Sequence, residues 1–104
     1  MVLVQQQTIT VVNQEQFKVY RAAGHPTIDV RTPEEFAQGH IEGAQNINLF
    51  DANFIDQFKV YDKEKPLLLY CRSGNRSGRA AKLLDSLGFQ KLYDLQGGFL
   101  AWSL

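Results

Sequence analysis

Four consecutive apolar and aromatic residues, Leu67 to Tyr70, run directly into the one cysteine of the chain, Cys71. A short run of this kind is typical of a strand that is buried on both faces of a parallel sheet. A polar loop with a glycine at its centre follows. From Gly78 onward, apolar residues recur at helical spacing, at Ala80, Ala81, Leu83, Leu84 and Leu87. The sequence therefore predicts a strand, a loop headed by cysteine, and a helix.

This arrangement favours a negative charge on the cysteine sulfur. The first N–H groups of a helix have no partner within the helix, and the positive end of the helix dipole lies there. A loop folded over that end adds further N–H groups and forms an anion-binding nest. A lone cysteine is often only a small buried apolar residue. Here Arg72, Arg76 and Arg79 follow within a few residues, and this surrounding favours a nucleophilic thiolate.

The rest of the chain alternates between the two kinds of element. Stretches rich in β-branched and apolar residues predict strands at 8–12, 27–30, 45–48, 67–70 and 91–95. Capping signals, apolar periodicity and glycine stops predict helices at 14–23, 33–38, 50–58, 78–87 and 99–102. Strands joined by helices require crossover connections, which give a parallel sheet covered on both faces. In such a sheet the functional site lies beyond the carboxyl ends of the strands, where Cys71 is expected.

Length and composition exclude several other classes of protein. The 104 residues fit one domain, 1–104, and the formal net charge is zero, so neither nucleic acid nor a membrane surface is the expected partner. One cysteine permits no internal disulfide and no cysteine-rich metal site. The first ten residues lack the features of a signal peptide, and no apolar run is long enough to span a bilayer. We therefore expect a cytoplasmic, reducing location, which suits a working thiol.

Four segments, in order along the chain, resemble the signatures of one family. They are IDVRTPEEF at 28–36, GHIEGAQNI at 39–47, the Cys-x-x-x-x-Arg loop from Cys71 to Arg76, and LQGGFLAW at 95–102. Together they are similar to the rhodanese-type sulfurtransferases. The resemblance implies a single rhodanese-like α/β domain with a five-stranded, mostly parallel sheet and helices on both faces.

The resemblance also implies an activity. Cys71 would take the sulfane sulfur of thiosulfate or a small persulfide, carry it as a persulfide, and pass it to a thiol or cyanide-like acceptor, with an acceptor protein as a further possible partner. This is covalent, two-stage catalysis, and it requires no cofactor and no metal. Arg76 would orient the anionic donor and Arg72 would attract it. Persulfide binding is assigned to the loop as a whole: Arg72, Ser73, Gly74, Asn75, Arg76 and Ser77.

Other polar residues are expected to be structural. Asp29 and Arg31 are expected to bond neighbouring loops, and His40 has no metal-ligand partner at suitable spacing. Glu34 and Glu35 are interpreted only as residues that start a helix. Trp102 is expected in the core or as a cover over one end of the fold.

Two other classes of function remain open. Phosphatases and arsenate reductases resemble this pattern but have a Cys-x5-Arg loop, one residue longer, which surrounds a larger anion. In this chain Ser77 stands at that position and the arginine comes one residue earlier. The other class is a non-catalytic rhodanese-like module that binds a partner, because a fold alone does not fix a function. Retention of Cys71 argues against it.

Overall fold

The computed structural model describes residues 7–102. Within them, five strands form one sheet in the order β1-β5-β4-β2-β3, and every pair of neighbours is parallel. This arrangement confirms the predicted five-stranded parallel sheet. The strands are β1 (Ile9–Val12), β2 (Thr27–Asp29), β3 (Gln45–Asn46), β4 (Leu67–Tyr70) and β5 (Leu92–Leu95).

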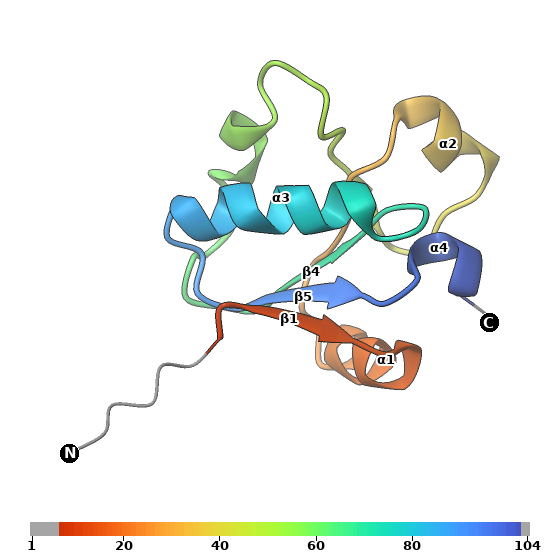
Figure 1. Ribbon diagram of the computed structural model, residues 1–104, viewed down its shortest axis with the longest axis horizontal. Helices are drawn as coiled ribbons and strands as arrows, with labels where there is room; N and C mark the ends of the chain where they lie inside the picture. The colour runs from red at the N-terminus through yellow and green to blue at the C-terminus, as the bar shows by residue number, and fades with distance from the viewer. Residues whose placement is uncertain (1–6, 103–104) are drawn as a thin grey trace.

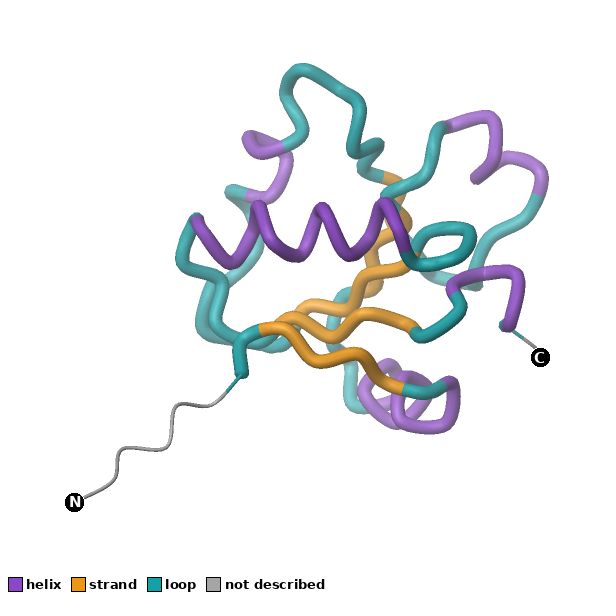
Figure 2. The backbone as a smooth tube through the Cα atoms, viewed as in Figure 1, coloured by secondary structure: helices purple, strands orange, loops and turns teal. Residues whose placement is uncertain are grey.

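Helices cover both faces of the sheet, and two further helices lie beyond the carboxyl ends of the strands. Figure 1 shows α3 on one face, α1 on the other, and α2 with α4 beyond the arrowheads of the strands. The tube in Figure 2 shows the loop between β4 and α3 at that same edge. The helical elements are α1 (Gln14–Ala22), α2 (Pro33–Gln38), the 3₁₀ helix η1 (Ile55–Phe58), α3 (Asn75–Ser86) and α4 (Gly98–Ala101).

The central strand β4 has a buried side chain at all four positions. Leu67 and Leu69 belong to a core cluster with η1 and α3, whereas Leu68 and Tyr70 belong to a cluster that includes Phe17 of α1. This alternation is the two-residue period of a strand. Burial on both faces explains why β4 reads as a continuous apolar run.

Two capping boxes begin α1 and α2 as the sequence predicts. Asn13 accepts the backbone N–H of Gln16, whose side chain accepts the N–H of Asn13. Thr32 and Glu35 make the same exchange at the start of α2, with a proline at the first turn. Each cap stabilises its helix by about 1 kcal/mol. The cap on α2 also sets where Glu35 lies.

The helix predicted over residues 50–58 is wrong in its first half. Turns occupy that part, and the only helical segment is η1. The side chain of Asn48 accepts the N–H of Phe50, and the Asn48 carbonyl accepts the N–H of Asp51. Local bonds of this kind offer the backbone an alternative to an α-helix. Phe50 remains 61% exposed, while Phe54 and Phe58 are buried.

Smaller corrections concern α3 and β3. Helix α3 begins at Asn75, three residues before Gly78, and Leu83 is 42% exposed rather than part of the buried face. Strand β3 ends at Asn46, although the backbone N–H of Ile47 still donates to β2. Of the ten-residue segment predicted to lack signal-peptide features, residues 1–6 lie outside the described residues. No helix among residues 7–102 is long and apolar enough to cross a membrane.

Candidate active site

Cys71 lies at the carboxyl end of β4, with its side chain only 1% exposed. The loop turns so that the backbone N–H of Gly74 donates to Sγ at 3.0 Å. Gly74 has φ of 117° and precedes α3 directly, and other residues rarely adopt this backbone conformation. Among the described residues, one backbone N–H group of the loop, that of Gly74, is directed at the sulfur; the wider nest of loop N–H groups stays a prediction.

Ser77 supports the sulfur from the first turn of α3. Its Oγ lies 3.4 Å from Sγ of Cys71, and its hydroxyl lies 3.2 Å from the Gly74 carbonyl, to which it donates. Ser77 is fully buried. Ser73 and Asn75, by contrast, are exposed, and the described part of the chain provides no hydrogen bond to their side chains. The structure thus brings Gly74 and Ser77 to the sulfur, but not the other two side chains.

The start of α4 holds the cysteine loop from outside. The N–H of Phe99 donates to the carbonyl of Cys71 at 2.8 Å, and the N–H of Leu100 donates to the carbonyl of Arg72 at 3.0 Å. A Cβ atom on Gly98 would stand 2.5 Å from the Arg72 oxygen, so only glycine fits this approach. The sequence signal for this close approach is the position of the pair Gly97–Gly98 directly beyond the carboxyl end of a predicted strand.

Arg76 forms a bidentate ion pair with Glu35 of α2. Its two terminal nitrogens lie 2.6 and 2.9 Å from the two carboxylate oxygens. This contact lowers the pKa of Glu35 to about 2, helped by hydrogen bonds from Thr32. The interpretation of Glu35 as a helix-start residue and nothing more is wrong, because its carboxylate also anchors the cysteine loop to α2. The guanidinium assigned to the anionic donor already has a carboxylate partner.

Asp29 and Arg31 form a second, deeper pair. The guanidinium of Arg31 lies 2.7 Å from a carboxylate oxygen of Asp29, and both side chains are almost fully buried. It also donates to the carbonyl of Gly39 at 2.7 Å and lies over the ring of Phe99, 4.6 Å from its centroid. The expected structural role, bonding a neighbouring loop, is what these contacts provide.

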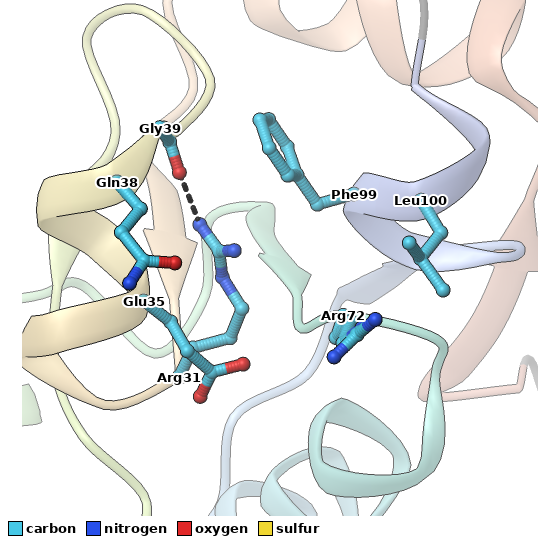
Figure 3. A pocket seen from close by; sticks show the side chains of 7 residues that line it. All are labelled: Arg31, Glu35, Gln38, Gly39, Arg72, Phe99 and Leu100. Carbon is cyan, nitrogen blue, oxygen red and sulfur yellow. Dashed lines mark hydrogen bonds between the residues drawn. The ribbon is translucent and has the colours of Figure 1, made fainter.

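A pocket of about 280 Å³ opens beside the cysteine loop, between α2 and α4. Figure 3 shows Glu35 and Gln38 on one side of it, and Arg72 with Leu100 on the other. Arg72 is exposed and has no ion-pair partner among the described residues. It is therefore the free positive charge at the pocket. The full lining is Arg31, Glu35, Gln38, Gly39, Arg72, Phe99 and Leu100.

One buried acid near the site escaped sequence reasoning. Asp94 of β5 is 5% exposed, and burial raises its pKa to about 6 although the Ser77 hydroxyl acts in the opposite direction. Its Oδ1 atom has no hydrogen-bond partner in the described part of the chain. The sequence shows Asp94 as a charged residue inside a predicted strand. It does not show whether that strand lies inside the sheet or at its edge, where solvent would reach the carboxylate.

The remaining candidates lie away from the sulfur. His40 is exposed and stacks on Phe36 with ring centroids 3.7 Å apart, as a surface residue would. Trp102 packs edge-on against Phe17 and covers the second core cluster. Residues 7–102 contain no group of three or more His, Cys, Asp or Glu side chains placed to hold a metal ion.

Comparisons with known proteins agree with this geometry. The rhodanese-like domain matches residues 13–104. An uncharacterized Bacillus subtilis protein, YqhL, is 41% identical over 99 residues, covering 94% of this chain and 75% of its own. The thiosulfate sulfurtransferase GlpE of Pseudomonas fluorescens is 36% identical over 88 residues, covering 85% and 79%. A human single-domain sulfurtransferase superimposes with a TM-score of 0.75 at 28% identity, covering 88% of this chain and 93% of the other. The chain belongs to the rhodanese-like domain family.

Proposed function

We propose that this protein is a sulfurtransferase that moves a sulfane sulfur from thiosulfate or a small persulfide to a thiophilic acceptor through a persulfide on Cys71. The observation that carries the proposal is the 3.0 Å hydrogen bond from the Gly74 N–H to Sγ. A bond to sulfur from a fixed N–H group stabilises a sulfur anion more than a neutral thiol. A similarity to a relative named thiosulfate sulfurtransferase supports it.

The first stage loads the sulfur. The Cys71 thiolate attacks the outer sulfur of thiosulfate, a new sulfur–sulfur bond forms, and the old one breaks with its electron pair leaving on sulfite. The enzyme then carries a persulfide whose outer sulfur bears the negative charge. The Gly74 N–H, the start of α3 and the nearby guanidinium of Arg76 favour a negative charge in this loop.

The second stage unloads it. A nucleophilic acceptor such as cyanide or a thiolate attacks the outer sulfur, and Cys71 leaves as the thiolate. The two stages share one covalent intermediate, so ping-pong kinetics are expected. No step requires a metal or a redox cofactor, because the donor supplies the sulfur and both electrons of each bond are accounted for.

The two arginines of the loop divide the work. Arg72 faces the pocket without an ion-pair partner among residues 7–102, so it attracts the dianionic donor. Arg76 keeps the loop fixed to α2 through Glu35, and its positive charge is close enough to interact with Cys71. The pocket volume of about 280 Å³ leaves room for a thiol or persulfide larger than thiosulfate. A lone thiol also suits a reducing compartment such as the cytoplasm.

Intact mass spectrometry provides the test. After incubation with thiosulfate and removal of excess donor, the protein should gain the mass of one sulfur atom, and cyanide should remove it. Cys71→Ser should show no gain and no transfer to cyanide, while its fold is retained because a hydroxyl replaces a thiol of similar size. Failure of the native protein to load sulfur from thiosulfate and from small persulfides would contradict the proposal.

The alternative hypothesis, that the protein is a phosphatase, makes a different prediction. An anion nest has a radius set by the number of its residues, and the loop here closes on a single sulfur atom with the arginine at Arg76. We expect no hydrolysis of aryl phosphates by the native protein. Inserting a glycine between Ser73 and Gly74 should reduce sulfur transfer and widen the nest toward phosphate or arsenate. Native phosphatase activity that disappears in Cys71→Ser would favour the other class.

A further inference from the structure

The side chain of Phe99 connects α4 to the buried ion pair of Asp29 and Arg31. Its ring extends from α4 toward Gly39 and the guanidinium of Arg31, as Figure 3 shows. The guanidinium lies 4.6 Å from the centroid of the ring, and a cation over an aromatic face at this distance is attracted to it. The cation itself is fixed, because it bonds the Asp29 carboxylate and donates to the Gly39 carbonyl. Phe99 therefore packs on a group that is held from two sides.

The backbone of Phe99 holds the cysteine loop. Its N–H donates to the Cys71 carbonyl at 2.8 Å. The N–H of Leu100 donates to the Arg72 carbonyl at 3.0 Å. The approach is close, since a Cβ atom on Gly98 would stand 2.5 Å from the Arg72 oxygen. A displacement of α4 would therefore release both carbonyls together.

These two bonds also determine where two N–H groups of the loop point. In a trans peptide the carbonyl and the N–H lie on opposite sides of the peptide bond, and the described residues contain no cis peptide. Because the carbonyls of Cys71 and Arg72 point toward α4, the N–H groups of Arg72 and Ser73 point away from it. Neither N–H has an acceptor among residues 7–102. The next N–H of the loop, that of Gly74, donates to Sγ.

We propose that Phe99 is a positioning residue for sulfur transfer and sets the direction of the N–H groups of Arg72 and Ser73. Its ring, packed on Arg31, keeps α4 against the loop, so that these N–H groups donate to the outer sulfur of the persulfide on Cys71. That sulfur bears the negative charge once sulfite has left, and hydrogen bonds to a charged acceptor are the stronger ones. Donors fixed in advance need no reorganisation when the charge forms. The inference rests on the proposed sulfurtransferase activity, because the persulfide is its intermediate.

The first test asks whether the ring holds α4, and it does not depend on sulfur transfer. Phe99→Ala removes the ring and keeps the backbone N–H. Hydrogen exchange of the amides of residues 99 and 100, measured by NMR relative to the β4 amides, should become at least about tenfold faster. Gly98→Ala should have the same effect, since its Cβ atom forces α4 away from Arg72. Phe89→Ala, the control, removes a buried ring from a cluster that includes no residue of α4, and should leave this ratio unchanged.

The second test separates positioning from binding, with thiosulfate as donor and cyanide as acceptor. Phe99→Ala should lower kcat by about 10- to 100-fold, because the N–H donors are no longer aimed at the charged sulfur. KM for thiosulfate should change by less than about threefold, since the guanidinium of Arg72 that attracts the donor remains. Phe99→Leu, which retains apolar bulk without an aromatic face, should lie between the native protein and Phe99→Ala. Phe89→Ala should retain the native kcat below its unfolding temperature.

The N–H groups themselves can be observed. When thiosulfate loads the native protein, the amide proton signals of Arg72 and Ser73 should move downfield, as expected for donors to a charged acceptor. In loaded Phe99→Ala these shifts should be lost.

Amide exchange that Phe99→Ala leaves unchanged would overturn the inference. An effect of Phe99→Ala confined to KM would overturn it too, because the ring would then be only a wall of the pocket. Failure of the native protein to load sulfur would instead contradict the proposed function, while the exchange rates would still show whether Phe99 holds α4.

Discussion

Two buried aspartates lie in the same sheet, and the fold treats them in opposite ways. Asp29 at the end of β2 is fully buried and bonded by the guanidinium and the backbone N–H of Arg31. Asp94 at β5 is 5% exposed, has one orphan oxygen, and has no cation beside it among the described residues. Asp29 faces the cluster that contains Tyr70, whereas Asp94 faces α3.

The difference between a paired and an unpaired buried carboxylate corresponds to a difference in role. A buried carboxylate that is paired and hydrogen-bonded holds its neighbours in place and is costly only when its partner is lost. A buried carboxylate left unpaired destabilises its own charged form, and such perturbed groups concentrate at functional sites. Arg31, held by Asp29, donates to the carbonyl of Gly39, while Asp94 lies next to Gly78 of α3, the helix that begins beside the cysteine loop.

Removing the partner of Asp29 should give the largest effect on stability. Arg31→Ala leaves Asp29 buried without its cation and should lower the free energy of unfolding by about 3–5 kcal/mol. Arg72→Ala, the control at an exposed arginine, should change it by less than about 0.5 kcal/mol. Urea unfolding of both variants provides the measurement. A loss below about 1 kcal/mol in Arg31→Ala would show that the two aspartates are not so different.

Neutralising the unpaired acid should act in the opposite direction. The folded pKa of Asp94, about 6, lies above the ordinary value, so the native protein loses stability as pH rises from about 4 through 6. A shift of about two units corresponds to about 3 kcal/mol. Asp94→Asn should remove this loss, so its stability relative to the native protein should be greater at pH 8 than at pH 4. Urea unfolding midpoints of both proteins at pH 4 and pH 8 provide the measurement. A difference between variant and native protein that is the same at both pH values would contradict the prediction.

The partly buried pair between Arg76 and Glu35 should have an effect on stability between these extremes. Its pKa of about 2 for Glu35 means that the stabilisation is complete above about pH 4.5 and is lost as pH falls toward 2. Solvent screening limits it to about 1 kcal/mol. Glu35→Gln should lose that amount at neutral pH and show less acid sensitivity than the native protein. Glu34→Gln, at the exposed neighbour on α2, is the control; a matching response would exclude a specific pair.

The smallest effect concerns Arg72, which forms no ion pair with any residue that the structure describes. Arg72→Ala should leave stability unchanged and raise KM for dianionic thiosulfate by about three- to tenfold, since one attractive charge at the pocket is removed. KM for an uncharged persulfide donor should hardly change. Lys82→Ala, at an exposed position farther along α3, supplies the control for net charge. Equal changes for both donors would show that Arg72 shapes the pocket rather than attracting the donor.

Local signals made most of the fold predictable. The apolar run of β4, the two capping boxes and the glycine stops act within a few residues, so the sequence alone places them. The helix predicted after β3 was wrong in its first half because the Asn48 side chain accepts the backbone N–H of Phe50. Helix propensity does not show whether such a local bond or a helical bond forms. The position of Cys71 was predictable for the same local reason. Glu35, which bonds Arg76 of the cysteine loop, and Asp94, which lies next to α3, come from distant elements, and contacts of this kind are not encoded in spacing.

The bonds from α4 to the cysteine loop have a consequence for how the protein is made. The N–H groups of Phe99 and Leu100 hold the carbonyls of Cys71 and Arg72, yet they are synthesised well after them. A nascent chain that has released Cys71 but not Gly98 carries its thiol on an unfinished loop. Reactivity should therefore appear only when α4 docks, and a free chain ending just before Gly98 should lack it. The nucleophile is thus synthesised before the helix whose N–H groups hold its loop in place.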